Sequence, residues 1–123
     1  MSFRAYHPER GDLVHMKFSP SAGHELADRH YALVLSAETY ARKSGMAVVC
    51  GITSRVRGGP FEVKLPRGLL PPKQGVGEIA SIIMADAVRQ VDYREREMAF
   101  VAAAPPAVIE EVLDKLLAVL EEE

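Results

Sequence analysis

Two short stretches of the sequence hold the residue types that could carry out acid–base and phosphate chemistry. The first precedes an apolar run and contains Glu25, Asp28, Arg29 and His30. The second ends another apolar run and contains Thr53, Ser54, Arg55 and Arg57. Cationic and hydroxyl groups that converge from two loops suit a phosphodiester, because cations bind the phosphate and donors stabilise the extra charge of its transition state. Spacing alone also allows a simpler interpretation, that of ordinary polar surface loops.

Other kinds of site are disfavoured by the motifs that the sequence lacks. The four histidines, His7, His15, His24 and His30, have neither HxxxH nor zinc-finger spacing, so we expect no metal and no cofactor. Glycine-rich phosphate loops and the GxSxG nucleophile elbow are absent. The one cysteine, Cys50, excludes intramolecular disulfides and is expected to pack as a small hydrophobe. Arg10-Gly11-Asp12 precedes an apolar run and is expected to form a turn rather than an adhesion motif.

Charge is distributed unevenly along the chain. The 123 residues include 15 Lys and Arg against 17 Asp and Glu, a formal charge of −2. Residues 1–70 hold ten bases and six acids, whereas residues 71–123 hold five bases and eleven acids. The two parts therefore carry +4 and −6. Such asymmetry hints at a surface that faces a polyanion, although a solvated acidic helix beside scattered basic residues would give the same numbers.

Length and composition predict one globular domain over residues 1–123. Apolar residues make up 48% and charged residues 26%, which excludes a disordered tail, a collagen-like repeat and a coiled coil. The N-terminus has no apolar segment typical of a secretion signal, and no apolar run approaches the roughly 20 residues that span a bilayer. We therefore expect a cytoplasmic protein.

Hydrophobic patterning predicts a mainly β protein with helices, in the α+β class. Strands are expected at Leu13–Phe18, Tyr31–Leu35, Ala47–Thr53, Phe61–Leu65, Ile79–Met84 and Val88–Tyr93. A short helix is expected at Ala37–Lys43, ended by Gly45. Ile109, Val112, Leu113, Leu116 and Leu120 recur at helical spacing after Pro105-Pro106. The pattern indicates a small curved sheet or barrel over about residues 9–103, followed by an amphipathic helix over about residues 105–121.

An ordered set of short motifs resembles one known family. The motifs are Arg10-Gly11-Asp12-Leu13-Val14, Phe18-Ser19-Pro20, Gly23-His24-Glu25, Ala32-Leu33-Val34-Leu35-Ser36, Gly45-Met46, Ile52-Thr53-Ser54, Pro60-Phe61-Glu62-Val63 and Ala85-Asp86-Ala87-Val88-Arg89. Their order, nearly without gaps over residues 9–94, is similar to that of the MazF/PemK toxin endoribonucleases of type II toxin–antitoxin systems. An ordered set of this kind is much more specific than any single motif.

The resemblance implies a fold, an activity and partners. It implies a small SH3-like β-barrel of the CcdB/PemK type, usually a homodimer, which cuts single-stranded RNA at short sequences without metal. It also implies a cognate antitoxin that covers the RNA groove. In such enzymes the 2′-hydroxyl attacks the adjacent phosphate and leaves a 2′,3′-cyclic phosphate. The protein must supply an acid or base and a group that holds the developing charge.

The resemblance, together with the residue types of the two stretches, gives the candidate site residues. Catalytic roles fall to Arg29, His30, Thr53 and Glu25, and RNA binding to Ser54, Arg55, Arg57, Lys17, His24 and Arg89. The family's Arg-Pro pair falls on His30-Tyr31, and Arg29 stands one place earlier. We hypothesise that His30 acts as acid or base, since an imidazole can serve either role, while Arg29 supplies fixed charge. Leu26 and Ala87 stand where the family has glutamine, so a decayed site is the alternative.

Two other functions compete with the nuclease. A non-catalytic toxin that resembles the gyrase poison CcdB would be expected to end in a Trp-Gly-Ile type of tail. This chain has no Trp and ends in Glu121-Glu122-Glu123, which counts against that interpretation. A binding module for RNA or protein that keeps the barrel without activity is the third interpretation.

Overall fold

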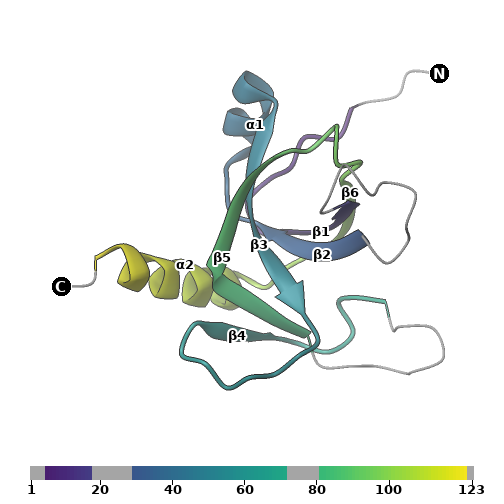
Figure 1. The fold of residues 1–123 in the computed structure, drawn as a ribbon. Helices are drawn as coiled ribbons and strands as arrows, with labels where there is room; N and C mark the ends of the chain where they lie inside the picture. The colour runs from purple at the N-terminus through teal and green to yellow at the C-terminus, as the bar shows by residue number, and fades with distance from the viewer. Residues whose placement is uncertain (1–4, 18–28, 72–80, 122–123) are drawn as a thin grey trace.

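One curled antiparallel sheet carries two helices (Figure 1). Within residues 5–17, 29–71 and 81–121, which the computed structural model describes, there are six strands and two helices. Their bounds are β1 (Asp12–Lys17), β2 (Arg29–Val34), α1 (Glu38–Ser44), β3 (Met46–Thr53), β4 (Glu62–Leu65), β5 (Ser81–Asp92), β6 (Ala99–Ala103) and α2 (Pro106–Leu120). The strand order across the sheet is β4-β5-β3-β2-β1-β6. The predicted α+β class is confirmed.

Two strand predictions need correction. The segments predicted separately at Ile79–Met84 and Val88–Tyr93 are not two strands: their residues 81–84 and 88–92 belong to the single strand β5, which an irregularity interrupts without ending it, and Ile79 lies outside the described residues. There the register with β3 jumps from Cys50 opposite Val88 to Ile52 opposite Ile83. The edge strand β6 was not predicted from the sequence, because its Ala-Phe-Val-Ala-Ala segment is rich in alanine, a weak strand former. Pairing with β1 stabilises this strand, although its composition does not indicate one.

The two faces of the sheet pack separate apolar clusters, because successive strand residues point to opposite sides. The first cluster consists of Leu13, Leu33, Leu35, Cys50, Val63, Leu65, Ile83, Ala85, Ala104, Val108 and Val112. The second cluster consists of Val14, Met16, Ala32, Val34, Ala41, Ala47, Val49, Val91, Tyr93 and Met98. Helix α2 covers the first cluster, and α1 contributes Ala41 to the second. Each face of β1 and β2 is therefore fixed by its own buried residues.

Helix α2 forms where the periodicity predicts, but its last turn, residues 117–120, is exposed. Pro106 begins the helix, and Val108 and Val112 are buried against the sheet. Ile109, Leu113 and Leu116 are partly buried on the first cluster. Leu120, predicted to share this apolar face, is 71% exposed, because the end of α2 extends beyond the sheet (Figure 1). No helix among the described residues is long and apolar enough to span a membrane.

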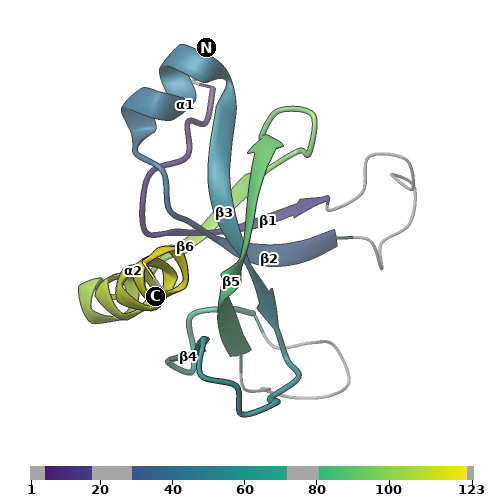
Figure 2. The ribbon, with the colours of Figure 1, turned by 60° about the vertical axis from the view of Figure 1, so that its left-hand side comes forward.

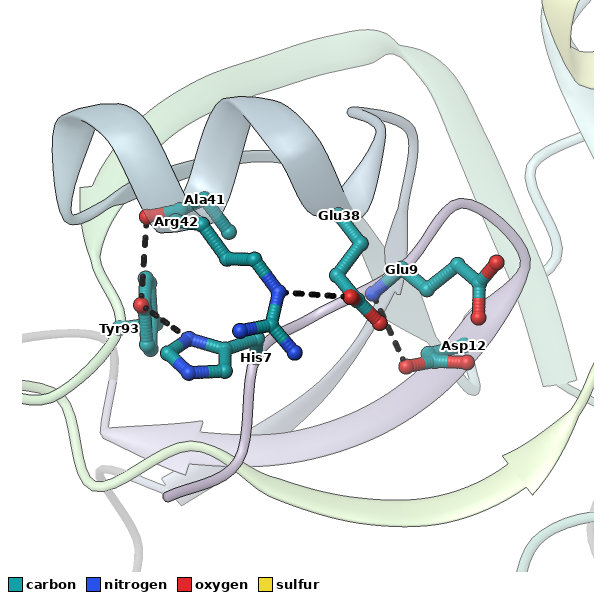
Figure 3. A network of polar contacts seen from close by, with 7 residues as sticks. All are labelled: His7, Glu9, Asp12, Glu38, Ala41, Arg42 and Tyr93. Carbon is teal, nitrogen blue, oxygen red and sulfur yellow. Dashed lines mark hydrogen bonds and ion pairs between the residues drawn. The ribbon is translucent and has the colours of Figure 1, made fainter. Parts of the chain in front are cut away.

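Helix α1 lies against the N-terminal segment and the end of β5 (Figure 3). The Tyr93 hydroxyl donates to the Ala41 carbonyl at 3.3 Å and lies 3.0 Å from Nδ1 of His7. Gly45 ends the helix with a left-handed φ of 73°, and its N–H donates to the Ala41 carbonyl. These contacts join the N-terminal segment, α1 and β5, and the predicted short helix with its glycine end is confirmed.

Arg10-Gly11-Asp12 forms a turn at the start of β1, as predicted. Gly11 has a φ of 96°, a conformation that L-residues with a side chain rarely adopt. Its N–H donates to the Val34 carbonyl at 2.9 Å, and its carbonyl accepts from Ala104 N–H at 2.8 Å. The turn therefore ties the end of β2 to the start of α2. Asp12 accepts from Tyr6, and burial together with this hydrogen bond raises the pKa of Tyr6.

Candidate active site

The sheet divides into two arms where β2 and β3 part. Pairing between these strands ends at Ala32 opposite Gly51. Beyond that pair, β2 continues beside β1 to its first residue, Arg29, and β3 continues beside β5 to its last residue, Thr53. Figures 1 and 2 show the two arms running in different directions. The register shift between β3 and β5 lies at this point, and such irregularities bend a strand.

We call the divided end of the sheet the fork. One arm consists of residues 15–17 of β1 with residues 29–31 of β2, and the other consists of residues 52–53 of β3 with residues 81–83 of β5. Each of the two stretches singled out in the sequence contributes to a different arm. The fork thus brings them to the same end of the sheet.

His30 and Thr53 lie on the same face of the sheet, one on each arm of the fork. His30 is opposite Met16, which is buried in the second cluster, and directly opposed residues share a face. Ile52 packs against the first cluster, so the next residue, Thr53, belongs to the second-cluster face. His30 is exposed and Thr53 is half-buried. The fork therefore presents an imidazole and a hydroxyl on one side.

The Thr53 side chain is oriented by the loop that follows it. Its Oγ1 accepts a hydrogen bond from the Arg55 N–H at 3.1 Å, an arrangement typical of Ser/Thr turns. A hydroxyl that accepts a hydrogen bond can still donate its own hydrogen. Thr53 can therefore hold an oxygen of a bound phosphate while its own position is fixed by the backbone of the loop.

The loop between β3 and β4 carries exposed cations and is held by one carboxylate. Ser54, Arg55 and Arg57 are exposed. Glu62, the first residue of β4, accepts from Arg57 N–H through Oε2 and from Gly58 N–H through Oε1, each at 3.0 Å. Because the carboxylate binds the backbone, the loop has a defined course although its side chains face solvent.

Arg29 and His30 both belong to β2 rather than to the loop before it. Position 29 is opposite Lys17 in the β1–β2 register, and position 30 is opposite Met16. Inside a strand, successive positions belong to opposite faces of the sheet. The histidine is therefore the residue of this pair whose face matches that of Thr53.

The other predicted site residues are dispersed. Lys17 lies on the arm of β1, and its Nζ forms an ion pair with Glu97 at 3.0 Å. Arg89 is exposed on β5 opposite Val49, four positions along β3 from Thr53, which is roughly 13 Å at strand spacing. Glu25 and His24 lie outside the described residues.

Lys64 is a candidate site residue that the sequence did not reveal. It is exposed on β4 opposite Ile82, which is itself opposite Thr53 on the far side of β5. The three residues form a row across one face, with Lys64 two strand spacings, roughly 10 Å, from Thr53. The alternation of residues 61–65 indicates that Lys64 is exposed, but its link to Thr53 depends on β5 lying between their strands.

Cys50 packs in the first cluster, which confirms its predicted role as a small hydrophobe. Burial, with a smaller contribution from Asp86, raises the pKa of its thiol to about 12. Because the thiolate is the reactive form, this residue is a poor nucleophile. Among the described residues, no three His, Cys, Asp or Glu side chains come together as a metal site would require.

The chain matches a family model described as PemK-like, MazF-like toxin of type II toxin–antitoxin system over residues 9–120. It is 34% identical over 91 residues to the endoribonuclease toxin MazF of Escherichia coli K12, covering 74% of each chain. It is 33% identical over 114 residues to the endoribonuclease toxin ChpB of the same strain, covering 92% of this chain and 94% of ChpB.

Solved structures of MazF are also similar to this chain. A crystal structure of MazF from Deinococcus radiodurans is similar with a TM-score of 0.77 and 41% identity, covering 94% of this chain and 98% of that one. A MazE–MazF structure from the same organism has a TM-score of 0.77 and 36% identity, covering 97% of this chain and 100% of that one. The sheet that contains the fork, together with the C-terminal helix, thus has the fold of MazF structures. The chain belongs to the PemK-like, MazF-like toxin family of type II toxin–antitoxin systems.

Proposed function

We propose that this protein is the toxin of a type II toxin–antitoxin system and acts as a sequence-specific, metal-independent endoribonuclease on single-stranded RNA. Its relatives MazF and ChpB are named endoribonuclease toxins. The single observation that carries the proposal in this chain is the placement of His30 and Thr53 on one face of the fork, on two diverging arms. An extended RNA strand that enters the fork can have one phosphate between them.

The proposed reaction needs two proton transfers and one stabilised phosphate. His30 takes the proton of the 2′-hydroxyl as its oxygen attacks the adjacent phosphorus, and the bond from phosphorus to the 5′-oxygen breaks. The leaving 5′-oxygen takes up a proton from solvent, the protonated His30 returns its proton to solvent, and the upstream product keeps a 2′,3′-cyclic phosphate. Thr53 donates its hydroxyl hydrogen to a phosphate oxygen on which negative charge develops. The reaction consumes no water and uses no metal.

Cations of the β3–β4 segment bind the flanking phosphates in this proposal. Arg55 and Arg57, on the loop that follows Thr53, and Lys64, on β4, are exposed. We assign Ser54 to the same interface and keep Arg29 and Glu25 as supporting catalytic groups. Lys17, His24 and Arg89 remain RNA-binding candidates, with Lys17 the weakest of the three because its ammonium already pairs with Glu97.

The proposed physiological partner is an antitoxin protein. Solved structures of similar proteins include a complex of MazE with MazF and a complex of an endoribonuclease with its cognate antitoxin. An antitoxin that shields the fork would have to compete with RNA for the cations of the β3–β4 loop. A homodimer, as the resemblance implies, located in the cytoplasm completes the proposal.

The proposal is tested by incubating the purified protein with a mixed-sequence RNA in excess EDTA. We expect defined fragments whose upstream ends carry 2′,3′-cyclic phosphate, because none of the proposed steps needs a metal. Mapping of the fragment ends gives the recognition sequence. RNA that stays intact but migrates more slowly on a native gel would instead indicate a binding module without nuclease activity.

A further inference from the structure

Glu62 is a glutamate at the centre of a positively charged segment. Between residues 54 and 67 the sequence has Arg55, Arg57, Lys64 and Arg67 and no other acid. If the Glu62 carboxylate acted through its charge alone, it would repel RNA phosphates and weaken RNA binding. The contacts of Glu62 indicate a different role.

The carboxylate of Glu62 binds the main chain of the basic loop. Its two oxygens accept from the consecutive N–H groups of Arg57 and Gly58, each at 3.0 Å. Consecutive amides converge on one anion when a left-handed residue is part of the turn, and Gly58 has a φ of 77°. The Gly58 conformation and the Glu62 carboxylate together fix the backbone position of Arg57, and therefore the point from which its side chain extends.

Helix α2 holds the main chain of Glu62. Lys115 Nζ donates to the main-chain carbonyl of Glu62 at 2.8 Å and pairs with Glu111 one helical turn earlier at 3.0 Å. Phe61 and Val63, on either side of Glu62, pack against the first cluster. Glu62 is therefore a rigid point in the fold to which a solvent-exposed loop is attached.

We infer that Glu62 is a positioning residue for RNA binding. It holds the β3–β4 loop, and with it the backbone of Arg57, in a fixed course next to the Thr53 arm of the fork before RNA arrives. A loop that is ordered in advance does not lose its backbone freedom on binding. The entropic penalty of fixing even one residue at that moment would weaken binding by about tenfold. This inference rests on the proposed nuclease function and names one determinant of its substrate binding.

The sign of the effect of a neutral substitution separates positioning from simple charge. If Glu62 acted only as an anion, Glu62→Gln would remove repulsion and lower the KM for RNA. If it acts through the two amides, Glu62→Gln loses one of two acceptors, because an amide side chain has a single oxygen. We then expect KM to rise about threefold in Glu62→Gln and about tenfold in Glu62→Ala, with kcat changed less than about twofold, as for lost uniform binding.

The test combines cleavage kinetics on a fluorescent RNA oligonucleotide with a double-mutant cycle. Arg57→Gln is measured alone and together with Glu62→Ala, and the pair is expected to be non-additive because the loop acts through Arg57. Glu110→Gln, on the exposed side of α2, is the matched control for removal of one acidic charge and should leave KM within about twofold. Amide 15N relaxation of Arg57 and Gly58 should report greater mobility in Glu62→Ala, independently of RNA.

Each outcome has a definite meaning. An active wild type with a KM for Glu62→Gln at or below the wild-type value overturns the inference and leaves the proposed function in place. Fully additive effects of Glu62→Ala and Arg57→Gln also overturn it. A wild type that binds but does not cleave RNA overturns the proposed function and, with it, this inference. Unchanged thermal unfolding of Glu62→Ala would show that a raised KM does not come from global unfolding.

Discussion

A His30→Ala variant is expected to cleave RNA about 10²- to 10⁴-fold more slowly than wild type, with RNA affinity little changed, because loss of a general acid or base removes a factor of this size. His30 is a titratable group that shares a face of the fork with Thr53. Single-turnover cleavage of a short RNA oligonucleotide measures the effect. Affinity is measured separately on an oligonucleotide with 2′-deoxy sugars, which the proposed reaction cannot cleave.

The matched control is His15→Ala. His15 precedes Met16 on β1 and belongs to the opposite face, where its ring lies 5.0 Å from that of Tyr31. This variant should cleave at close to the wild-type rate. Arg29→Ala is measured in parallel, because our hypothesis divides the work between Arg29 and His30. Wild-type rates in both His30→Ala and Arg29→Ala would contradict that hypothesis.

A Gly11→Ala variant is expected to lose about 2–3 kcal/mol of the free energy of unfolding. A left-handed or similar positive φ costs a residue with a Cβ roughly 1–2 kcal/mol, and Gly11 has a φ of 96°. A Cβ at this position would also lie 2.6 Å from Cδ1 of Ile109, which must move within its contacts on the first cluster. The change therefore strains the link between β1, β2 and α2. Urea unfolding followed by circular dichroism measures it.

Gly45→Ala provides the comparison for Gly11→Ala. Gly45 also has a positive φ, 73°, but a Cβ there would meet nothing within 4 Å. Its loss should be limited to the backbone term, roughly 1–2 kcal/mol. Equal losses in the two variants would show that the contact between Gly11 and Ile109 contributes nothing, and no loss in either would contradict the role assigned to both turns.

The sequence predicts the fold well where hydrophobic periodicity agrees with Gly or Pro residues at the ends of the segments. The alternation in Phe61–Leu65, the glycine end of the short helix and the Pro-Pro start of α2 each correspond to an element in the structure. Prediction was less successful for strands that are stabilised mainly by pairing with a neighbouring strand. Strand β6 consists largely of alanine and depends on β1, and β5 remains one strand through an irregularity that the sequence suggests as a break.

The site was predictable in its residue types but not in its geometry. The motifs singled out His30 and Thr53, but whether two residues share a face depends on register and strand order. Lys64 joins Thr53 in one row only because β5 lies between β3 and β4. Glu62 belongs to a motif that the resemblance had identified, yet its binding of two loop amides follows from the turn at Gly58. Neither relation has a signal in the sequence.

The most direct measurement compares two oligonucleotides that differ by one oxygen atom. The first is RNA throughout and contains the mapped cleavage sequence, and the second replaces the nucleotide before the cleaved bond with its 2′-deoxy analogue. In EDTA, we predict that the protein cuts the first to leave a 2′,3′-cyclic phosphate and leaves that bond of the second intact, because the attacking 2′-hydroxyl is missing. Cleavage of both at similar rates would contradict the proposed mechanism.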